Sequence, residues 1–189
     1  MNHVTPQQAW QVLQTAECLY TAAQVEAALD AMAQAITEVL SGSNPLMICL
    51  MNGGVVPFGK LLPRLNFPLQ VDYVHATRYR EKLYGSDLEW RAGPFVSAHN
   101  RTVLLIDDIL DSGETLAAIE KFYLGQGAKR VYKAVLTVKN RPRSVAIAAD
   151  FIGLEVPDRY VFGYGMDYKG YLRNAPGIYA LFQSPELDL

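Results

Sequence analysis

The sequence predicts an α/β fold in which a central, mostly parallel, twisted sheet is flanked by helices. Two apolar runs carry this prediction, residues 46–51 (L-M-I-C-L-M) and 103–106 (V-L-L-I). Neither run alternates polar and apolar residues, which is typical of a strand buried on both faces. A loop and then a helix pattern follow each run. Successive strand–helix units of this kind form parallel sheets with right-handed crossovers.

Length and composition favour one folded domain spanning residues 1–189. Half of the residues are hydrophobic, the net charge is −2 and the pI is about 5.9. These values exclude a disordered chain and argue against bulk electrostatic binding to nucleic acid. Cys18 and Cys49 form no metal-type or redox-type pair. No apolar run reaches the ~20 residues of a membrane span and no signal-peptide pattern is seen, so we expect a cytoplasmic protein without nucleic-acid or membrane partners.

The N-terminal segment is expected to be helical and structural. Thr5 with Gln8, and Thr21 with Gln24, form Thr-x-x-Gln boxes that cap two helices. In the second helix apolar residues recur at intervals of three and four, which indicates one buried face. That face would contain Val25, Leu29, Met32, Ile36 and Leu40.

Two loops follow the first predicted strands. Residues 46–51 end in Asn52-Gly53-Gly54, and a helix could begin at Phe58. The two glycines allow close approach of the backbone to a ligand, although a plain turn explains such a pair equally well. Residues 69–78 read as a strand, and the polar stretch 79–98 as a hairpin excursion, a mobile lid or both.

The central feature is the segment 103–116, V-L-L-I-D-D-I-L-D-S-G-E-T-L. Its buried strand leads into a polar block, Asp107 to Thr115, and a helix then continues to about Leu124. Backbone N–H groups at a helix N-terminus suit a phosphate, while the paired acids suit a hydroxylated sugar or a hard cation. Further strands are expected at 130–138, 151–154, 160–163 and 178–182.

Residue types with functional chemistry follow at least four of these strands, at 52–54, 78–79, 107–115 and 139–143. The carboxyl ends of parallel strands share one edge of the sheet, so we expect these loops to converge. Gly-rich backbone, paired acids, hydroxyls and bases together fit a phosphorylated sugar with a divalent cation.

The segment 103–116 resembles the phosphoribosyl pyrophosphate signature of the type I phosphoribosyltransferases. Four further segments are similar, in the same order, to hypoxanthine-guanine members of that family: L-M-N-G-G, K-N-R-P-R-S, D-F-I-G-L-E-V-P-D-R-Y-V-F-G-Y-G-M-D-Y and Y-L-R-N. The resemblance implies the fold of that family, with a mobile loop at about 79–98 and a purine-binding hood formed by 151–189. It also implies Mg²⁺ as cofactor and a homodimer or homotetramer.

The resemblance further implies how phosphoribosyl pyrophosphate would bind. Asp107 and Asp108 would bind the ribose hydroxyls, directly or through Mg²⁺. The loop that holds the 5′-phosphate would consist of Ser112, Gly113, Glu114 and Thr115. Contacts to pyrophosphate would come from Asn52, Gly53 and Arg173, with Arg78 and Tyr79 in the mobile loop. Asn52 departs from the lysine that is frequent in the family, and Arg78 from its serine.

For the purine, the resemblance implies that Asp111 accepts the N7 proton as general base and that Lys139 donates to O6. Tyr160 would stack on the base, and Val161 would present its backbone carbonyl. Asp167 would help hold Mg²⁺ and approach the 2-amino group. The alternatives from the residues alone are a surface lysine for Lys139, a core aromatic for Tyr160 and a loop-capping residue for Asp167.

The activity implied is purine salvage, in which hypoxanthine or guanine and phosphoribosyl pyrophosphate give IMP or GMP and pyrophosphate. A lysine facing position 6 favours a keto oxygen over an amino group, which selects against adenine. Two alternatives remain open. One is a transferase that prefers xanthine, and the other is a non-catalytic regulatory protein that senses phosphoribosyl pyrophosphate.

Overall fold

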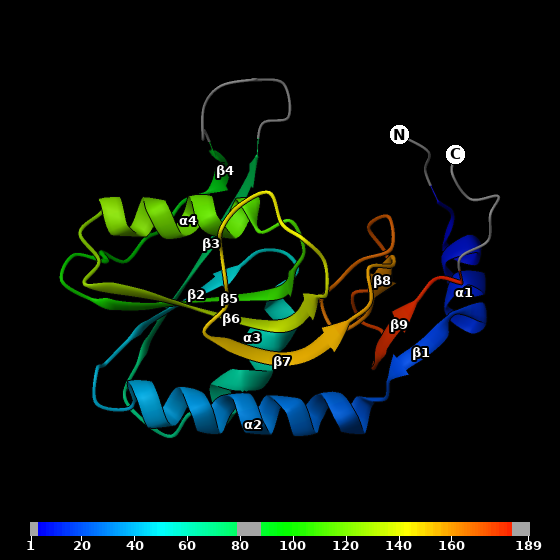
Figure 1. Ribbon diagram of the computed structural model, residues 1–189, viewed down its shortest axis with the longest axis horizontal. Coiled ribbons are helices and arrows are strands. Elements are labelled where there is room, and N and C mark those ends of the chain that lie inside the picture. The colour runs from blue at the N-terminus through cyan, green and yellow to red at the C-terminus, as the bar shows by residue number, and fades with distance from the viewer. Residues whose placement is uncertain (1–3, 79–87, 183–189) are drawn as a thin grey trace.

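The computed structural model describes residues 4–78 and 88–182. These residues form two β-sheets and the helices around them (Figure 1). The helices are α1 (Pro6–Thr15), α2 (Ala22–Leu40), α3 (Val55–Leu61), the 3₁₀ turn η1 (Leu62–Arg64) and α4 (Glu114–Gly125). The strands are β1 (Glu17–Tyr20), β2 (Leu46–Leu50), β3 (Gln70–Arg78), β4 (Leu88–Ala92), β5 (Thr102–Leu110), β6 (Arg130–Lys139), β7 (Phe151–Val156), β8 (Val161–Phe162) and β9 (Ile178–Ala180).

The larger sheet has six strands in the order β4-β3-β2-β5-β6-β7. All neighbouring pairs in it are parallel except β3 with β4. This confirms the predicted α/β fold with a mostly parallel central sheet. The carboxyl ends of its parallel strands point towards the smaller sheet, on the right in Figure 1.

Helices cover both faces of the central sheet, with α4 on one side and α2 and α3 on the other (Figure 1). Successive side chains of β5 alternate between the two resulting cores. Leu104 and Ile106 pack on the side of α2, while Val103 and Leu105 pack on the side of α4. The run 103–106 is therefore apolar without interruption because neither face of the strand meets water.

Both predicted capping boxes are formed. Thr5 and Thr21 each accept a hydrogen bond from the backbone N–H of the glutamine three residues later, and each glutamine side chain accepts one in return. The apolar set predicted for the second helix is buried, with Ala33 in addition.

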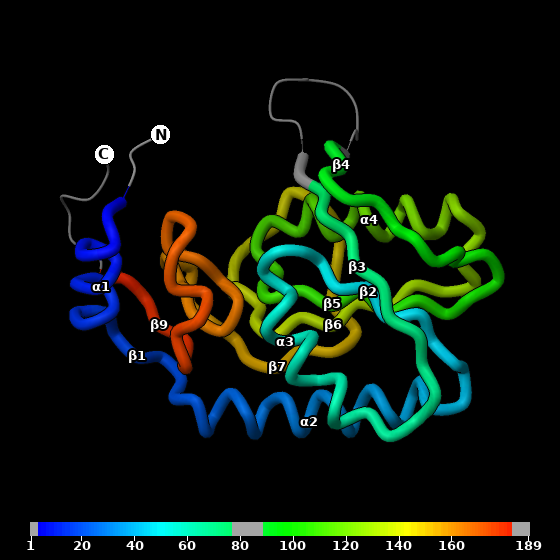
Figure 2. Tube along the Cα trace, turned by 180° about the vertical axis from the view of Figure 1, so that it is seen from behind, coloured from blue at the N-terminus to red at the C-terminus, as the bar shows by residue number. Residues whose placement is uncertain are grey.

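The smaller sheet is antiparallel and has the order β1-β9-β8. Its first strand, β1, lies between the two N-terminal helices and was not expected from the sequence. The range expected for the hood was 151–189, of which residues 183–189 lie outside the described part. Residues 151–182 divide between the two sheets, because β7 pairs with β6 in the central sheet. Seen from behind, the segment between β8 and β9 lies at the end of the central sheet, beside the start of α3 (Figure 2).

Part of the range expected for the mobile loop, 79–98, forms regular structure. Residues 79–87, including Tyr79, lie outside the described residues. From Leu88, strand β4 pairs with β3, and the buried carboxylate of Asp72 accepts the N–H groups of Phe95 and Val96 at 2.7 and 2.8 Å. The described part of this excursion is therefore fixed to the sheet.

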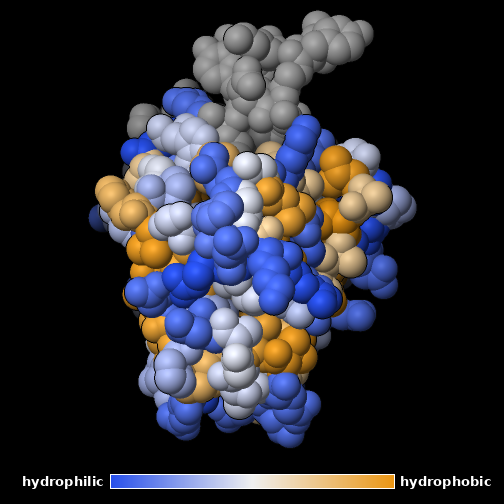
Figure 3. Space-filling view, turned by 90° about the vertical axis from the view of Figure 1, so that its left-hand side faces the viewer, coloured by the Kyte–Doolittle hydropathy of each residue, from blue (hydrophilic) through white to orange (hydrophobic). Residues whose placement is uncertain are grey.

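The end of the molecule opposite the smaller sheet is mostly polar. Figure 3 shows hydrophilic side chains along the middle of this end and hydrophobic ones in separate patches. Within residues 4–78 and 88–182, no helix combines the length and the hydrophobicity needed to cross a bilayer.

Glu26 on α2 connects three parts of the fold. Its carboxylate pairs with Lys60 at 2.7 Å and Arg64 at 2.6 Å, and it accepts a hydrogen bond from the hydroxyl of Tyr164. Hydrogen bonds from Lys60, Tyr164 and Arg64 lower the pKa of Glu26 to about 2, below its ordinary value of 4.5. Its ionised form therefore stabilises the fold above about pH 4.5, and this contribution is lost as the pH falls towards 2.

We expect Glu26→Gln to lower the free energy of unfolding by about 1 kcal/mol near neutral pH, a small value because the carboxylate is partly exposed. The deficit should narrow as the pH falls from about 6 to about 3. Urea denaturation at both pH values measures this. Glu38→Gln is the matched control, because Glu38 lies on the same helix and accepts a hydrogen bond from neutral Gln34. An equal deficit for Glu26→Gln at both pH values would contradict the assignment.

Candidate active site

Two adjacent acids lie near the end of β5, in the middle of the central sheet. β5 runs to Leu110, so Asp107 and Asp108 belong to the strand and not to the loop after it. The N–H of Asp108 donates to Oδ1 of Asp107 at 3.0 Å. Burial raises the pKa of both carboxyl groups, and the neighbouring charge of Asp108 adds to the effect on Asp107. A cation or hydroxyl donors at this position would relieve that cost.

The glycines after β2 pack directly against these acids. A Cβ on Gly53 would lie 2.1 Å from Oδ2 of Asp108, and one on Gly54 would lie 2.6 Å from the carbonyl oxygen of Ile106. Both positions must therefore be glycine because no side chain would fit between the neighbouring segments, and not merely because the chain turns here. The peptide bond between Met51 and Asn52 is cis, and Asn52 is exposed.

The loop after β5 turns into α4 at Gly113, which has φ of +77°. A Cβ at Gly113 would also lie 2.4 Å from Ile147, so both conformation and space require glycine here. No side chain caps α4, and its first helical hydrogen bond runs from Ala117 to the carbonyl of Gly113. Gly113, Thr115 and Leu116 at this helix start line the second cavity described below, and a helix N-terminus is suited to an anion.

Two adjoining cavities occupy the carboxyl edge of the sheet. The first, of about 200 Å³, is lined by Asp108, Ile109, Asp111, Lys139, Tyr160, Val161, Met166 and Asp167. The second, of about 340 Å³, is lined by Met51, Gly53, Asp107, Asp108, Ile109, Leu110, Asp111, Ser112, Gly113, Thr115, Leu116, Asp167 and Arg173. Asp108, Ile109, Asp111 and Asp167 belong to both, so the two cavities form one continuous site.

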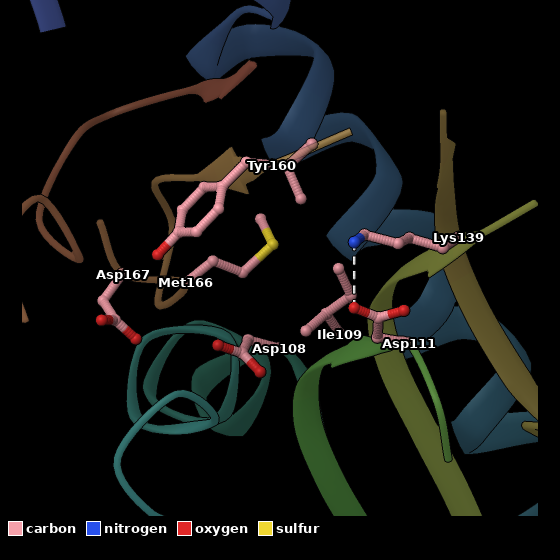
Figure 4. Close-up of a pocket in the computed structure, with 8 residues that line it drawn as sticks. Asp108, Ile109, Asp111, Lys139, Tyr160, Met166 and Asp167 are labelled. Atoms are coloured by element: carbon pink, nitrogen blue, oxygen red, sulfur yellow. Dashed lines mark hydrogen bonds and ion pairs between the residues drawn. The ribbon is translucent and has the colours of Figure 1, made fainter. Parts of the chain in front are cut away.

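The first cavity has an aromatic wall and a cationic wall. Tyr160 and Met166 face Lys139 across it, with Ile109 between them and with Asp108 and Asp111 along the lower side in the view of Figure 4. Tyr160 is 45% exposed and its ring meets that of Tyr168 edge-on, so it is not a core aromatic. An exposed ring at the mouth of a cavity is suited to stacking on a flat ligand.

Asp111 is the centre of an ion cluster. Its Oδ2 lies 2.9 Å from Nζ of Lys139, and its Oδ1 lies 3.3 Å from NH1 of Arg141. Asp158 faces the same two cations, at 3.7 Å from Lys139 and 3.3 Å from Arg141. Lys139 is therefore a largely buried, paired cation, with 11% of its side chain exposed, and not a surface lysine. Arg143 donates to the backbone carbonyls of Asp111 and Lys139, which joins the ends of β5 and β6.

Asp167 and Arg173 form a second ion pair, in the loop between β8 and β9. NH2 of Arg173 lies 2.6 Å from Oδ1 of Asp167, and its NH1 donates to the carbonyl of Gly165 at 2.7 Å. The other oxygen of Asp167 accepts the N–H of Gly170 at 2.6 Å. Asp167 thus caps its own loop while it lines both cavities. Arg173 also lies 4.0 Å from Asp108, which partly offsets that buried charge.

The carboxylates of this site fit a cation that also binds the substrate. Among residues 4–78 and 88–182, no group of three or more His, Cys, Asp or Glu side chains is arranged to hold a metal ion. Mg²⁺ is usually bound by one or two carboxylates together with substrate phosphates and water. The adjacent carboxylates of half-buried Asp107 and buried Asp108 could serve as these ligands, whereas both oxygens of Asp167 are engaged by Arg173 and Gly170.

The structure brings together most of the candidate residues. Those that line the two cavities are Gly53, Asp107, Asp108, Asp111, Ser112, Gly113, Thr115, Lys139, Tyr160, Val161, Asp167 and Arg173. Asn52 and Glu114 are their chain neighbours, and Ser144 donates to Glu114 at 3.1 Å. For Arg78 the described part is its backbone in β3.

Sequence reasoning did not assign a role to Arg141, Asp158 or Met166. Position was the available signal for the first two. Lys139 and Val156 lie opposite each other on neighbouring strands, and Arg141 and Asp158 follow them by two residues each, so both lie beyond the same edge of the sheet. Met166 lies inside the segment 150–168 that resembles the hypoxanthine-guanine members of the family. The sequence around a methionine does not distinguish a side chain that lines a cavity from one that packs in the hydrophobic core.

Comparison with known proteins agrees with this geometry. Residues 16–169 match the phosphoribosyl transferase domain family. The hypoxanthine-guanine phosphoribosyltransferase of Homo sapiens is 29% identical over 155 residues, which cover 77% of this chain and 71% of that protein. The fold is similar to a hypoxanthine phosphoribosyltransferase from Staphylococcus aureus, with TM-score 0.84, 25% identity, and coverage of 92% and 94% of the two chains. It is also similar to a hypoxanthine-guanine-xanthine phosphoribosyltransferase, with TM-score 0.80, 26% identity, and coverage of 87% and 96%.

Proposed function

Since the chain belongs to the phosphoribosyl transferase family and is thereby a transferase, we propose that it is a purine salvage enzyme that acts on 6-oxopurines. It transfers the 5-phosphoribosyl group from phosphoribosyl pyrophosphate to hypoxanthine or guanine. The N9–C1′ bond of IMP or GMP forms as the bond between C1′ and pyrophosphate breaks, and the purine gives up one proton.

The observation that carries this proposal is the pair of adjoining cavities that share Asp108, Asp111 and Asp167. One has an aromatic wall and a largely buried lysine, which suits a flat base with a keto group. The other has a helix N-terminus, glycine backbone and Arg173, which suits phosphate groups. The shared acids lie where a bond between base and sugar would form.

In the second cavity, Asp107 and Asp108 bind the ribose hydroxyls. The 5′-phosphate lies on the turn before α4, held by Ser112, Gly113, Thr115 and the backbone of Glu114. Pyrophosphate leaves past Asn52, Gly53 and Arg173. Arg173 suits this role because its guanidinium already lies between two acids of the site.

In the first cavity, Lys139 donates to O6 of the purine and Tyr160 stacks on its ring. The backbone carbonyl of Val161 and the loop at Asp167 accept from the pyrimidine edge. Asp111 accepts the N7 proton as N9 bonds to C1′, and its charge stabilises the cationic sugar in the transition state. An adenine amino group would place a donor against the lysine, so adenine is rejected.

Mg²⁺ would be held by Asp107, Asp108 and Asp167 together with oxygens of phosphoribosyl pyrophosphate, and it would neutralise the charge of the leaving group. Both acids of β5 gain from a bound cation because burial raises their pKa. Binding at Asp167 would require its present contact with Arg173 to open.

The test is an assay of purified protein with Mg²⁺, phosphoribosyl pyrophosphate and one of four bases, followed by chromatography of the nucleotide. We expect IMP and GMP to form and AMP not to form. Xanthine is included because one structural relative is named for all three 6-oxopurines. A clear excess of XMP would reassign the base preference. Binding of phosphoribosyl pyrophosphate without any nucleotide product would instead support the regulatory alternative and reject the proposal.

A further inference from the structure

The ion cluster around Asp111 poses a problem for purine binding. Both carboxylate oxygens of Asp111 face cations, Lys139 at 2.9 Å and Arg141 at 3.3 Å (Figure 4 shows the first). The proposed function requires one of these oxygens to accept the N7 proton, and requires Lys139 to turn to O6. The closer contact must therefore open when a 6-oxopurine enters.

Opening that contact would leave Lys139 in need of another acid. Its side chain is only 11% exposed. A buried ammonium group without a paired carboxylate is costly, because little water remains to solvate it. Within the part of the chain that the structure describes, Asp158 is the second carboxylate paired with this lysine, at 3.7 Å. Asp158 is 49% exposed, so water can still reach its own charge.

The register of two neighbouring strands puts Asp158 in this place. Lys139 at the end of β6 lies opposite Val156 at the end of β7, and Asn140 donates to the carbonyl of Val156 at 3.1 Å. Asp158 follows two residues later, just before Tyr160. Its position is thus set by the central sheet, independently of the loop that carries Asp111.

We propose that Asp158 is a positioning residue for the purine, acting as the counter-ion that keeps Lys139 charged and directed into the cavity when Asp111 turns to N7. Arg141, which bridges the two acids, stays with Asp158 in the same step. This inference rests on the proposed function and deepens it. In this proposal, the 6-oxopurine can enter because Lys139 exchanges its ion pair with Asp111 for one with Asp158.

If Asp158 has this role, its loss should weaken binding of the purine and leave binding of phosphoribosyl pyrophosphate unchanged. Without the carboxylate of Asp158, Lys139 can only leave Asp111 at the cost of an unpaired buried charge, so the purine binds more weakly. Asp158 lines neither cavity and acts on the first through its contact with Lys139, whereas phosphoribosyl pyrophosphate binds in the second. The KM for hypoxanthine should therefore rise about tenfold in Asp158→Asn, with kcat and the KM for phosphoribosyl pyrophosphate within about twofold of wild type.

An equilibrium measurement tests the same point without turnover. 9-Deazaguanine keeps O6 and the N7 proton but has carbon in place of N9, so it cannot be converted. Its Kd in the presence of Mg²⁺ and phosphoribosyl pyrophosphate, measured by calorimetry, should rise about tenfold in Asp158→Asn. Asp158→Glu retains the carboxylate and should restore most of the affinity. Asp30→Asn is the matched control, because Asp30 on α2 is 67% exposed, pairs with Arg64 of η1 and lines neither cavity.

The outcomes separate the two proposals. A wild-type protein that forms no nucleotide from any 6-oxopurine rejects the proposed function itself. An active wild type together with unchanged purine KM and 9-deazaguanine Kd in Asp158→Asn rejects the role of Asp158 alone. A parallel rise of both KM values, or a loss of affinity that Asp158→Glu does not restore, would show a merely structural effect and also overturn it.

Discussion

Replacing Asp111 with Asn is expected to lower kcat by roughly 10²- to 10⁴-fold, the usual contribution of a positioned general base. The amide is close in size and can still meet Lys139, but it cannot take the N7 proton or stabilise a cationic sugar. The KM for phosphoribosyl pyrophosphate should change much less, because the residues around its phosphates are untouched. Steady-state kinetics with each substrate varied in turn measures the split.

The structure sharpens this expectation, since Asp111 lies 2.9 Å from Lys139 and lines both cavities. Asp30→Asn again provides a control that removes one exposed carboxylate elsewhere. Its kinetics should match wild type. Turnover at the wild-type rate in Asp111→Asn would remove the proposed role of Asp111 and leave proton transfer to another group.

Replacing Gly165 with Ala is expected to reduce kcat/KM at least ~10²-fold, because a displacement of about 1 Å in an active site has an effect of that order. Gly165 has φ of +111°, and a Cβ there would lie 2.2 Å from the carbonyl oxygen of Gly53. The clash is with backbone, so no side chain can rotate to relieve it. It would separate the loop that carries Met166 and Asp167 from the glycine loop after β2.

Gly170→Ala is a control that isolates backbone strain from the clash. Gly170 has φ of +90°, but a Cβ there meets no atom within 4 Å. Both variants should lose about 1 kcal/mol of stability from the unfavourable φ, measured by thermal or urea denaturation. Only Gly165→Ala should also lose most of its activity. Similar kinetics in the two variants would show that the contact between Gly165 and Gly53 does not hold the site together.

The hydrophobic pattern and the capping residues were sufficient to predict the main elements. The runs at 46–51 and 103–106 predicted buried strands because their side chains alternate between two covered faces. Thr5 and Thr21 predicted two helix starts because a capping box uses residues only three apart. These interactions are local, so the sequence displays them directly. The segment 103–116 likewise indicated a phosphoribosyl site, through its resemblance to a known signature.

Contacts between distant segments were not accessible in this way. β1 pairs with β9, about 160 residues further along the chain. The two strands have only four and three residues, too few for a hydrophobic pattern that would predict the pairing. The ion pairs of Asp111 with Lys139 and Arg141, and of both cations with Asp158, depend on the registers of β5, β6 and β7. Register is decided by packing of the whole sheet.

The hydrophobic runs were enough to indicate the fold class. The residue types at the strand ends indicated the chemistry available there: paired acids, a glycine turn suited to phosphate, a lysine and an aromatic ring. The folded arrangement, in contrast, sets which of these side chains neutralise one another. It placed Lys139 against Asp111 instead of leaving it unpaired, and it added Asp158 to the same cluster. The physical reason is that residue types follow from the sequence, whereas the energy of a charge depends on its burial and on the charges nearby.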